Sequence, residues 1–237
     1  MNKINVVDNK IIPFDNTDVI LNNNIITFTN NGDYYLEYIT SDNVNITINI
    51  EDNVCVQLFE YSNNNDINTN ITYNLGKNSS LIISKFYYND NTNEEINIYL
   101  NKKNANIKYN FSSISKNHDN YLINIYHNDS TTNSDIFNRT IAKENSSNNF
   151  DINSYVENKI LDCYLNQSTK IITLGDSNNK INPNMFTHDN SVTAIHASVI
   201  GNVNEEELFY LMSRGISYNE AIKIIIKGII LSNINPN

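Results

Sequence analysis

The chain has 237 residues and a formal net charge of −10, and its length suits one large domain or one domain with a small appendage. Lys and Arg number only 16 and form no run longer than Lys102-Lys103, which argues against nucleic-acid binding because such binding requires clustered cations. The N-terminus has no apolar run of signal-peptide length, and the longest apolar block (224–231) is too short to span a bilayer. The low number of cysteines, two, fits a reducing compartment. We therefore expect a cytoplasmic protein without a membrane segment.

Asparagine makes up about a fifth of the residues, and runs such as 22–24 and 63–65 could indicate a disordered, prion-like tract. Hydrophobic residues nevertheless make up 40% of the chain and alternate with the asparagines, which provides enough apolar surface for a core. We therefore expect a folded chain and attribute its asparagine and isoleucine content to the codon bias of an AT-rich genome.

Strict alternation of apolar and polar residues dominates residues 44–126 and is typical of half-buried β-strands. Ile46, Ile71 and Ile96 are 25 residues apart. Another apolar stretch begins at Tyr121, 25 residues further on. Two short strands per repeat with polar turns between them predict the stacked coils of a β-solenoid. An antiparallel β-sandwich has similar strand lengths, but only 6 Gly and 3 Pro leave few tight hairpins and favour the solenoid.

The pattern changes near the C-terminus, where two helices are expected over 205–214 and 218–227. Asn204 is placed as an N-cap, with Glu207 as its partner three residues later. Carboxylates in the first turn complement the helix dipole, and Gly215 is a natural left-handed stop. Ser217 and Glu220 form a second capping box. These signals predict a helical hairpin that closes an all-β body.

Motifs that carry chemistry are absent from the sequence. It contains no glycine-rich phosphate loop, no Cys-x-x-Cys and no His-Glu-x-x-His, and its scattered carboxylates offer no pair that could serve as general acid and base. The residues alone therefore predict no active site and favour a scaffold or binding protein over an enzyme.

The histidines and cysteines give weak signals. His118 and His127 lie in asparagine-rich segments that we expect to be exposed. His188 lies eight residues before His196, on the other side of a strand-like stretch, but nothing supplies further metal ligands. The alternation predicts an outward or locally packed position for Cys55, whereas the orientation of Cys163 is not predicted.

Residues 190–226 indicate a function more specifically than any of these features. They read NSVTAIHASVIGNVNEEELFYLMSRGISYNEAIKIII, and this stretch resembles the C-terminal region of the SufB/SufD family of iron–sulfur cluster assembly proteins. The resemblance implies a mainly β fold, a right-handed parallel β-helix capped by a C-terminal helical hairpin, with 1–203 as the β-helix core and 204–237 as the helical segment. Because strand-like sequence begins by 19–28, the N-terminal helical region usual in SufD proteins is expected to be missing.

Two positions distinguish the members of this family. SufB-type proteins carry a cysteine after a glutamine in a late coil, and here Gln167 is followed by Ser168. They also carry a glutamate after the strand histidine, and here Ala197 follows His196. Both departures resemble the SufD type. The resemblance makes His196 a functional candidate near the SufB–SufD interface, whereas Cys163 is offset from the SufB cysteine.

The resemblance also implies a complex with a SufB-like paralogue and two copies of a SufC-like ABC-type ATPase. No cofactor is expected to bind stably to this chain alone, and an iron–sulfur cluster is expected only at the interface of the complex. The candidates for ATPase docking are Glu205, Glu206, Leu208, Phe209, Tyr210, Arg214 and Gly215.

Three alternatives stay open at this point. A stand-alone β-solenoid could bind carbohydrate or be a degenerate polysaccharide-cleaving enzyme, for which the 15 Tyr could supply aromatic surface. A SufB-like homodimeric scaffold could serve both roles, and a homodimer could form in isolation from the same edge surfaces.

Overall fold

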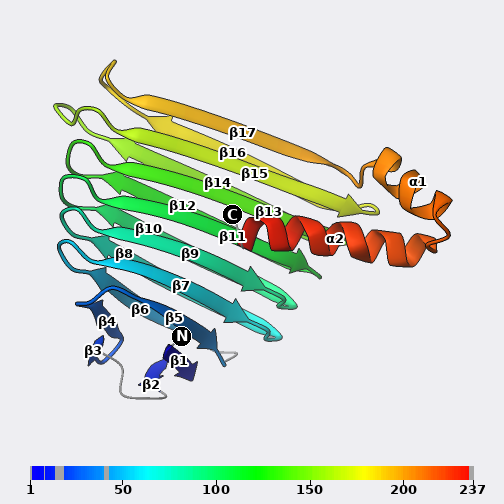
Figure 1. The fold of residues 1–237 in the computed structure, drawn as a ribbon, viewed down its shortest axis with the longest axis horizontal. Coiled ribbons are helices and arrows are strands. Elements are labelled where there is room, and N and C mark those ends of the chain that lie inside the picture. Colours follow the sequence, from blue (N-terminus) through cyan, green and yellow to red (C-terminus); the bar gives the residue numbers. More distant parts are fainter. Residues whose placement is uncertain (1, 8, 14–18, 40–42, 235–237) are drawn as a thin grey trace.

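The computed structural model describes residues 2–7, 9–13, 19–39 and 43–234. Over these residues the chain forms two β-sheets that face each other, followed by two helices (Figure 1). Sheet A contains, in spatial order, β2 (Lys10–Pro13), β1 (Asn2–Val7), β5 (Gly32–Tyr38), β7 (Cys55–Ser62), β9 (Ser80–Tyr87), β11 (Asn106–Ser115), β13 (Asn133–Lys143), β15 (Tyr164–Leu174) and β17 (Thr193–Asn202). Sheet B contains β3 (Val19–Asn22), β4 (Ile25–Phe28), β6 (Asn43–Ile50), β8 (Asp66–Leu75), β10 (Asn91–Leu100), β12 (His118–His127), β14 (Ser147–Val156) and β16 (Asn178–Phe186).

From β4 onward, successive strands alternate between the two sheets, and each pairs in parallel with the strand one coil away. This arrangement confirms the β-solenoid and excludes the antiparallel sandwich. Ile46 pairs with Ile71, and Ile71 with Ile96, which are the 25-residue steps expected. The next step is longer, because Ile96 pairs with Ile123. The expected alignment of Tyr121 with Ile96 is therefore wrong, since longer turns shift the register by two residues.

Antiparallel hairpins begin the stack. β1 pairs with β2, and β3 pairs with β4, before the parallel coils take over. The strand-like segment expected over 19–28 is therefore confirmed as two short strands.

The core fills the space between the sheets with one side of every strand. Ile71, Ile96 and Ile123 are at most 1% exposed, while the residues between them face outward. Burial of each such side chain contributes about 1.5–3 kcal/mol. Because a coil buries its apolar side only against its neighbours, this stabilisation depends on the stack as a whole.

Asparagine has a structural role in the turns. Asn53, Asn78 and Asn104 have φ values of 63°, 54° and 60°, a left-handed conformation that asparagine tolerates better than most residues. Their side chains also form a ladder, in which Asn78 Nδ2 donates to Asn53 Oδ1 at 2.9 Å and Asn104 Nδ2 to Asn78 Oδ1 at 2.8 Å. The amides therefore join successive coils at these three turns.

The helices are α1 (Glu205–Ser213) and α2 (Tyr218–Ile234). Asn204 Oδ1 accepts from the backbone amides of Glu206 and Glu207 at 2.9 and 3.4 Å, and Gly215 has a φ of 85°, as expected. The expected end of the second helix at 227 is wrong. Tertiary packing extends it, because Ile230 and Ile234 are buried against the outer face of sheet A.

The position of α2 also differs from the sequence-based expectation. It lies along the outer face of sheet A, over β9, β11 and β13, and does not cover the end of the stack (Figure 1). Ile230 and Ile234 pack with Ile141 and Ile172, and Asn233 Nδ2 donates to Phe111 O at 2.8 Å. The last strands, β16 and β17, consequently stay uncovered.

Candidate functional site

His196 lies in the middle of β17, where its side chain is exposed. Its register partner on β15 is Gln167, which is buried and points into the stack. Since in-register residues of parallel strands face the same side, His196 lies on the inward side of sheet A, at its last strand. Gln167 Nε2 donates to Ser154 Oγ at 2.8 Å and to Asn184 O at 3.2 Å. Its Oε1 is buried and has no partner among the described residues.

The two positions that distinguish the family types are neighbours in space. Ser168 and Ala197 pair directly between β15 and β17, on the outward side of sheet A. Arg139 donates to Ser168 O at 3.1 Å and to its Oγ at 3.2 Å, and burial lowers the pKa of the Arg139 guanidinium. The pair therefore presents a hydroxyl held by an arginine next to a methyl group, and neither residue supplies a thiolate or a carboxylate.

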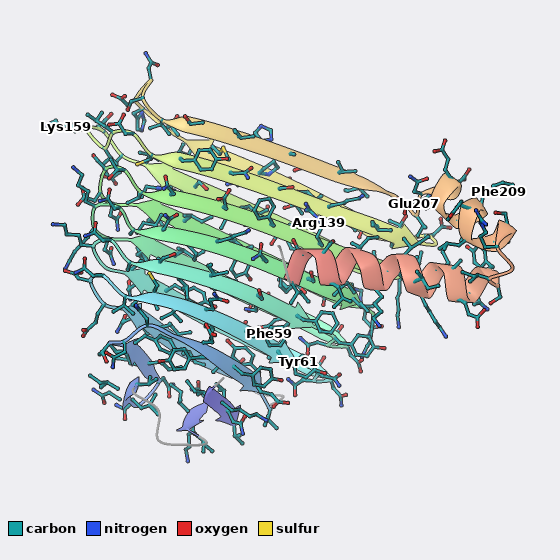
Figure 2. The ribbon with its side chains drawn as sticks, in the orientation of Figure 1. Phe59, Tyr61, Arg139, Lys159, Glu207 and Phe209 are labelled. Atoms are coloured by element: carbon teal, nitrogen blue, oxygen red, sulfur yellow. The ribbon has the colours of Figure 1, made fainter. Side chains whose placement is uncertain are left out.

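The proposed docking residues lie on α1 or directly after it, and Phe209 projects from this helix (Figure 2). Phe209 is 75% exposed and Tyr210 58% exposed, and the Arg214 guanidinium lies 5.3 Å from the centre of the Tyr210 ring. An apolar groove of about 570 Å³ lies between the helices, with Leu211 on one wall and Ile225 on the other. The remaining docking candidates are Glu205, which is exposed, Glu206, which lines this groove, Leu208, which is half-buried, and Gly215, which ends the turn after α1.

His127 corrects the sequence-based expectation of exposure. It is buried between two hydroxyls, with Thr132 Oγ1 at 2.8 Å from Nδ1 and Ser134 Oγ at 3.0 Å from Nε2. Burial lowers its pKa to about 4, so the imidazole is neutral at physiological pH. His127 is the last residue of β12 and lies on the inward side of the alternating pattern. The asparagine-rich sequence around it had suggested exposure.

The other candidate ligands are scattered. His118 is exposed, with Nδ1 at 2.7 Å from Ser147 Oγ, and His188 is also exposed. Cys55 is exposed, as its alternation indicated, while Cys163 is buried and lies 3.3 Å from Thr132 Oγ1. Within the described residues, no group of three or more His, Cys, Asp or Glu side chains could hold a metal ion.

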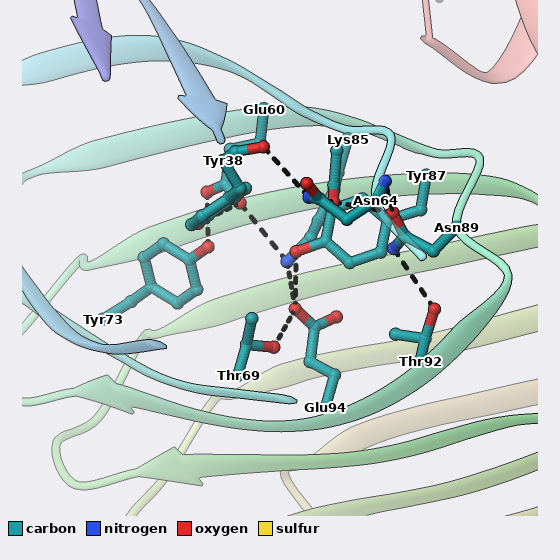
Figure 3. A network of polar contacts seen from close by, with 11 residues as sticks. Tyr38, Glu60, Asn64, Thr69, Tyr73, Lys85, Tyr87, Asn89, Thr92 and Glu94 are labelled. Atoms are coloured by element: carbon teal, nitrogen blue, oxygen red, sulfur yellow. Dashed lines mark hydrogen bonds and ion pairs between the residues drawn. The ribbon is translucent and has the colours of Figure 1, made fainter. Parts of the chain in front are cut away.

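A buried charge cluster between the sheets escaped the sequence analysis (Figure 3). Lys85 Nζ lies 2.6 Å from Glu94 Oε1 and 3.3 Å from Glu60 Oε2, and all three side chains are fully buried. Their positions on the inward side of β7, β9 and β10 could have revealed them, because each interrupts an alternating row of apolar residues.

Tyrosine hydroxyl groups donate to both carboxylates of this cluster. Tyr38 donates to Glu60 at 3.0 Å and Tyr87 to Glu94 at 2.9 Å. Burial and, after it, the nearby carboxylates raise the pKa of both tyrosines well above the usual value. Because its charged groups are sealed from solvent, the cluster acts on stability and on the register of the coils rather than on a substrate.

In the part of the chain that the structure describes, neither helix has the length and apolarity needed to cross a membrane.

Comparisons with known proteins agree with this architecture. The family described as SUF system FeS cluster assembly, SufBD core domain, matches residues 20–229. The chain is 27% identical over 118 residues to the iron-sulfur cluster assembly protein SufD of Bacillus subtilis (strain 168), a match that covers 49% of this chain and 27% of that protein.

Two shorter matches lie in the same family. The chain is 54% identical over 35 residues to the iron-sulfur cluster assembly SufBD family protein PH1385 of Pyrococcus horikoshii, covering 15% of this chain and 8% of that protein. It is 44% identical over 46 residues to the SufBD family protein ycf24 of Galdieria sulphuraria, covering 19% of this chain and 21% of that protein. The matched segments therefore span about a quarter or less of each relative.

Proposed function

The chain belongs to the SufBD core-domain family of the SUF iron–sulfur cluster assembly system, and we propose that it acts there as a SufD-type scaffold subunit without catalytic activity of its own. The observation that carries the SufD assignment is the adjacent pair Ser168 and Ala197. A serine hydroxyl is a poor substitute for the thiolate that binds iron or accepts sulfur, and an alanine cannot replace a carboxylate. The match to a protein named SufD supports the same assignment.

The partner at the open end of the stack is a SufB-like paralogue. β16 and β17 end their sheets, and exposed strand edges pair readily with another chain. Phe186 on β16 ends a stack of aromatic rings, lying 5.0 Å from the Tyr155 ring, and is itself 49% exposed. A partner strand there would cover Phe186 and bring its own groups close to His196. In the absence of the paralogue, the same edges would support a homodimer.

The hairpin is the docking surface for a SufC-like ABC-type ATPase. α1 exposes Phe209 and Tyr210, whereas Ile230 and Asn233 fix the end of α2 to sheet A. Movement of an ATPase bound to α1 would therefore pull on the sheet through α2. The complex would contain two copies of the ATPase, and their movement would open the partner interface near His196. Iron and sulfur, the cargo of the pathway, would enter at this interface. The complex would act in the cytoplasm.

The carbohydrate-binding alternative gains no support from the aromatic surface. Tyr99, Tyr126 and Tyr155 on sheet B stack on each other, with ring centres 4.8 and 5.0 Å apart and planes within 10°. Both faces of Tyr126 and of Tyr155 are occupied by neighbouring rings, so these faces cannot stack on sugars.

Two matched substitutions test the proposal. We co-express the full chain with the paralogue and the ATPase, and measure retention of each on a tagged copy of this chain. Phe209→Ala should lower ATPase affinity at least tenfold, as for an exposed aromatic anchor, and leave the paralogue bound. Phe186→Ala should weaken binding of the paralogue and leave the ATPase bound.

Each substitution is the control for the other, because both remove an exposed phenyl ring. Retention of both partners by Phe209→Ala at wild-type affinity would show that α1 is not the docking surface. If neither protein binds the wild-type chain, the scaffold assignment itself is wrong.

A further inference from the structure

A second apolar groove lies on the other side of α2, where the helix meets sheet A. Its volume is about 480 Å³. Phe86, Ile114 and Leu174 line it from sheet A, and Ile226 and Leu231 from the helix. Leu231 is 45% exposed, so apolar surface remains accessible after α2 has packed. The groove thus adjoins the anchor of α2 and is separate from the surface of α1.

Lysines surround this groove. Lys143 lines it from β13, and Lys223 and Lys227 from α2. Lys116 lies beside it, with Nζ 3.8 Å from the centre of the Tyr88 ring and 2.8 Å from Asp90 Oδ1. In the described part of the chain, Lys143, Lys223 and Lys227 form no ion pair, although Glu220 lies close enough to Lys223 for a weak attraction. A chain with net charge −10 therefore concentrates unpaired cations around one apolar surface.

The groove between α1 and α2 has the opposite charge. Glu206 and Glu207 line it, and its lining contains no lysine or arginine. One helix thus separates two apolar grooves, one with acidic and one with basic edges. A single amphipathic segment would not satisfy both, because the charges flanking its apolar face would be repelled by one of them.

We propose that the basic groove binds the apolar face of an acidic amphipathic helix from a partner protein, a segment whose carboxylates the acidic groove between α1 and α2 would repel. Leucine-type side chains of the partner would enter between Phe86 and Leu231, and its flanking carboxylates would pair with Lys223, Lys227 and Lys143. A helix fits better than a membrane surface, because the apolar residues line a recess. The inference is independent of the ATPase assignment.

Two synthetic peptides test the proposal with the full chain. Both are fluorescein-labelled 16-residue helices with leucine at every third or fourth position, and their flanking positions carry glutamate in one and lysine in the other. Fluorescence anisotropy should show binding of the glutamate peptide, weakened by salt. Lys223→Glu combined with Lys227→Glu should weaken that binding at least tenfold. Lys103→Glu with Lys180→Glu makes the same change in net charge on exposed residues elsewhere and should have little effect.

A second pair of variants separates the two grooves. Leu231→Gln should lower the affinity for the glutamate peptide several-fold, because it removes exposed apolar surface from the basic groove. Ile224→Gln, in the groove between the helices, should leave that peptide unaffected. Circular dichroism establishes that each variant is folded.

Three results would overturn the proposal. One is equal binding of the glutamate and lysine peptides, and another is unchanged affinity after the double charge reversal or after Leu231→Gln. The third is tight binding to vesicles containing 30% phosphatidylglycerol with no measurable binding of the glutamate peptide, which would assign the lysines to a lipid surface.

Discussion

At the scale of single residues, the most consequential feature is Lys85 between Glu60 and Glu94. Charges removed from water carry a large desolvation cost, which a buried ion pair offsets only when its geometry is good. Here one ammonium contacts two carboxylates at 2.6 and 3.3 Å, and tyrosine hydroxyls donate to both. The cluster therefore favours one register of the coils, since a slipped strand would leave a buried charge unpaired.

Lys85→Met should destabilise the protein by about 3–5 kcal/mol, because it leaves two carboxylates buried without a cation. Urea unfolding monitored by tyrosine fluorescence measures the change. The control is Lys102→Met, which breaks the exposed pair with Asp52 and should cost far less, because solvent screens exposed ion pairs. A similar loss in both variants would show that burial of the Lys85 cluster has no special effect.

At the scale of elements, asparagine stabilises three successive turns of the solenoid. The left-handed backbone at Asn53, Asn78 and Asn104 and the amide ladder between their side chains occur together at these three turns. Either feature alone would suit several residue types, but the combination favours asparagine. A composition first attributed to codon bias therefore also serves the stacking of coils.

Asn78→Ala should cost about 1–2 kcal/mol, because alanine is strained in the left-handed region and cannot join the ladder. Asn78→Gly keeps the backbone conformation accessible and should cost less, so the difference between the two isolates the strain. Both values come from urea unfolding. Equal losses would mean that the ladder, and not the backbone conformation, determines the preference for asparagine.

At the scale of the whole molecule, burial between the sheets couples stability to pH. Asp119 and His127 stand at opposite ends of β12, both facing inward. Burial raises the pKa of Asp119 from 3.8 to about 6. Burial lowers the pKa of His127 from 6.5 to about 4. The two groups therefore act on stability with opposite signs in acidic solution.

The signs follow from proton linkage. The contribution of Asp119 is complete below pH 3.8 and is lost as the pH rises through about 6, whereas that of His127 is complete above pH 6.5 and is lost as the pH falls through about 4. Each amounts to about 3 kcal/mol, so they nearly cancel. Asp119→Asn should therefore make stability rise between pH 4 and 6.5, and His127→Gln should make it fall. Denaturant unfolding across this range measures both, and identical profiles for the two variants would contradict the assignment.

The sequence by itself determined the solenoid and the start of each helix. Alternating side chains specify which face of a strand is buried, and the caps at Asn204 and Ser217 are satisfied by residues two or three positions away. It also carried the family assignment, through residues that lie close together in the chain.

Only the tertiary structure decided which buried groups meet and where the second helix lies. Lys85 finds Glu60 because coils stack in one register, and α2 extends to Ile234 because sheet A supplies Ile141 and Ile172 to cover it. His127 is buried because the coils stack in this register. Local periodicity determines which side of each strand faces the core. Contacts between residues tens of positions apart depend instead on the number of residues in each turn. The turns of this protein vary in length, so these contacts could not be predicted from the periodicity.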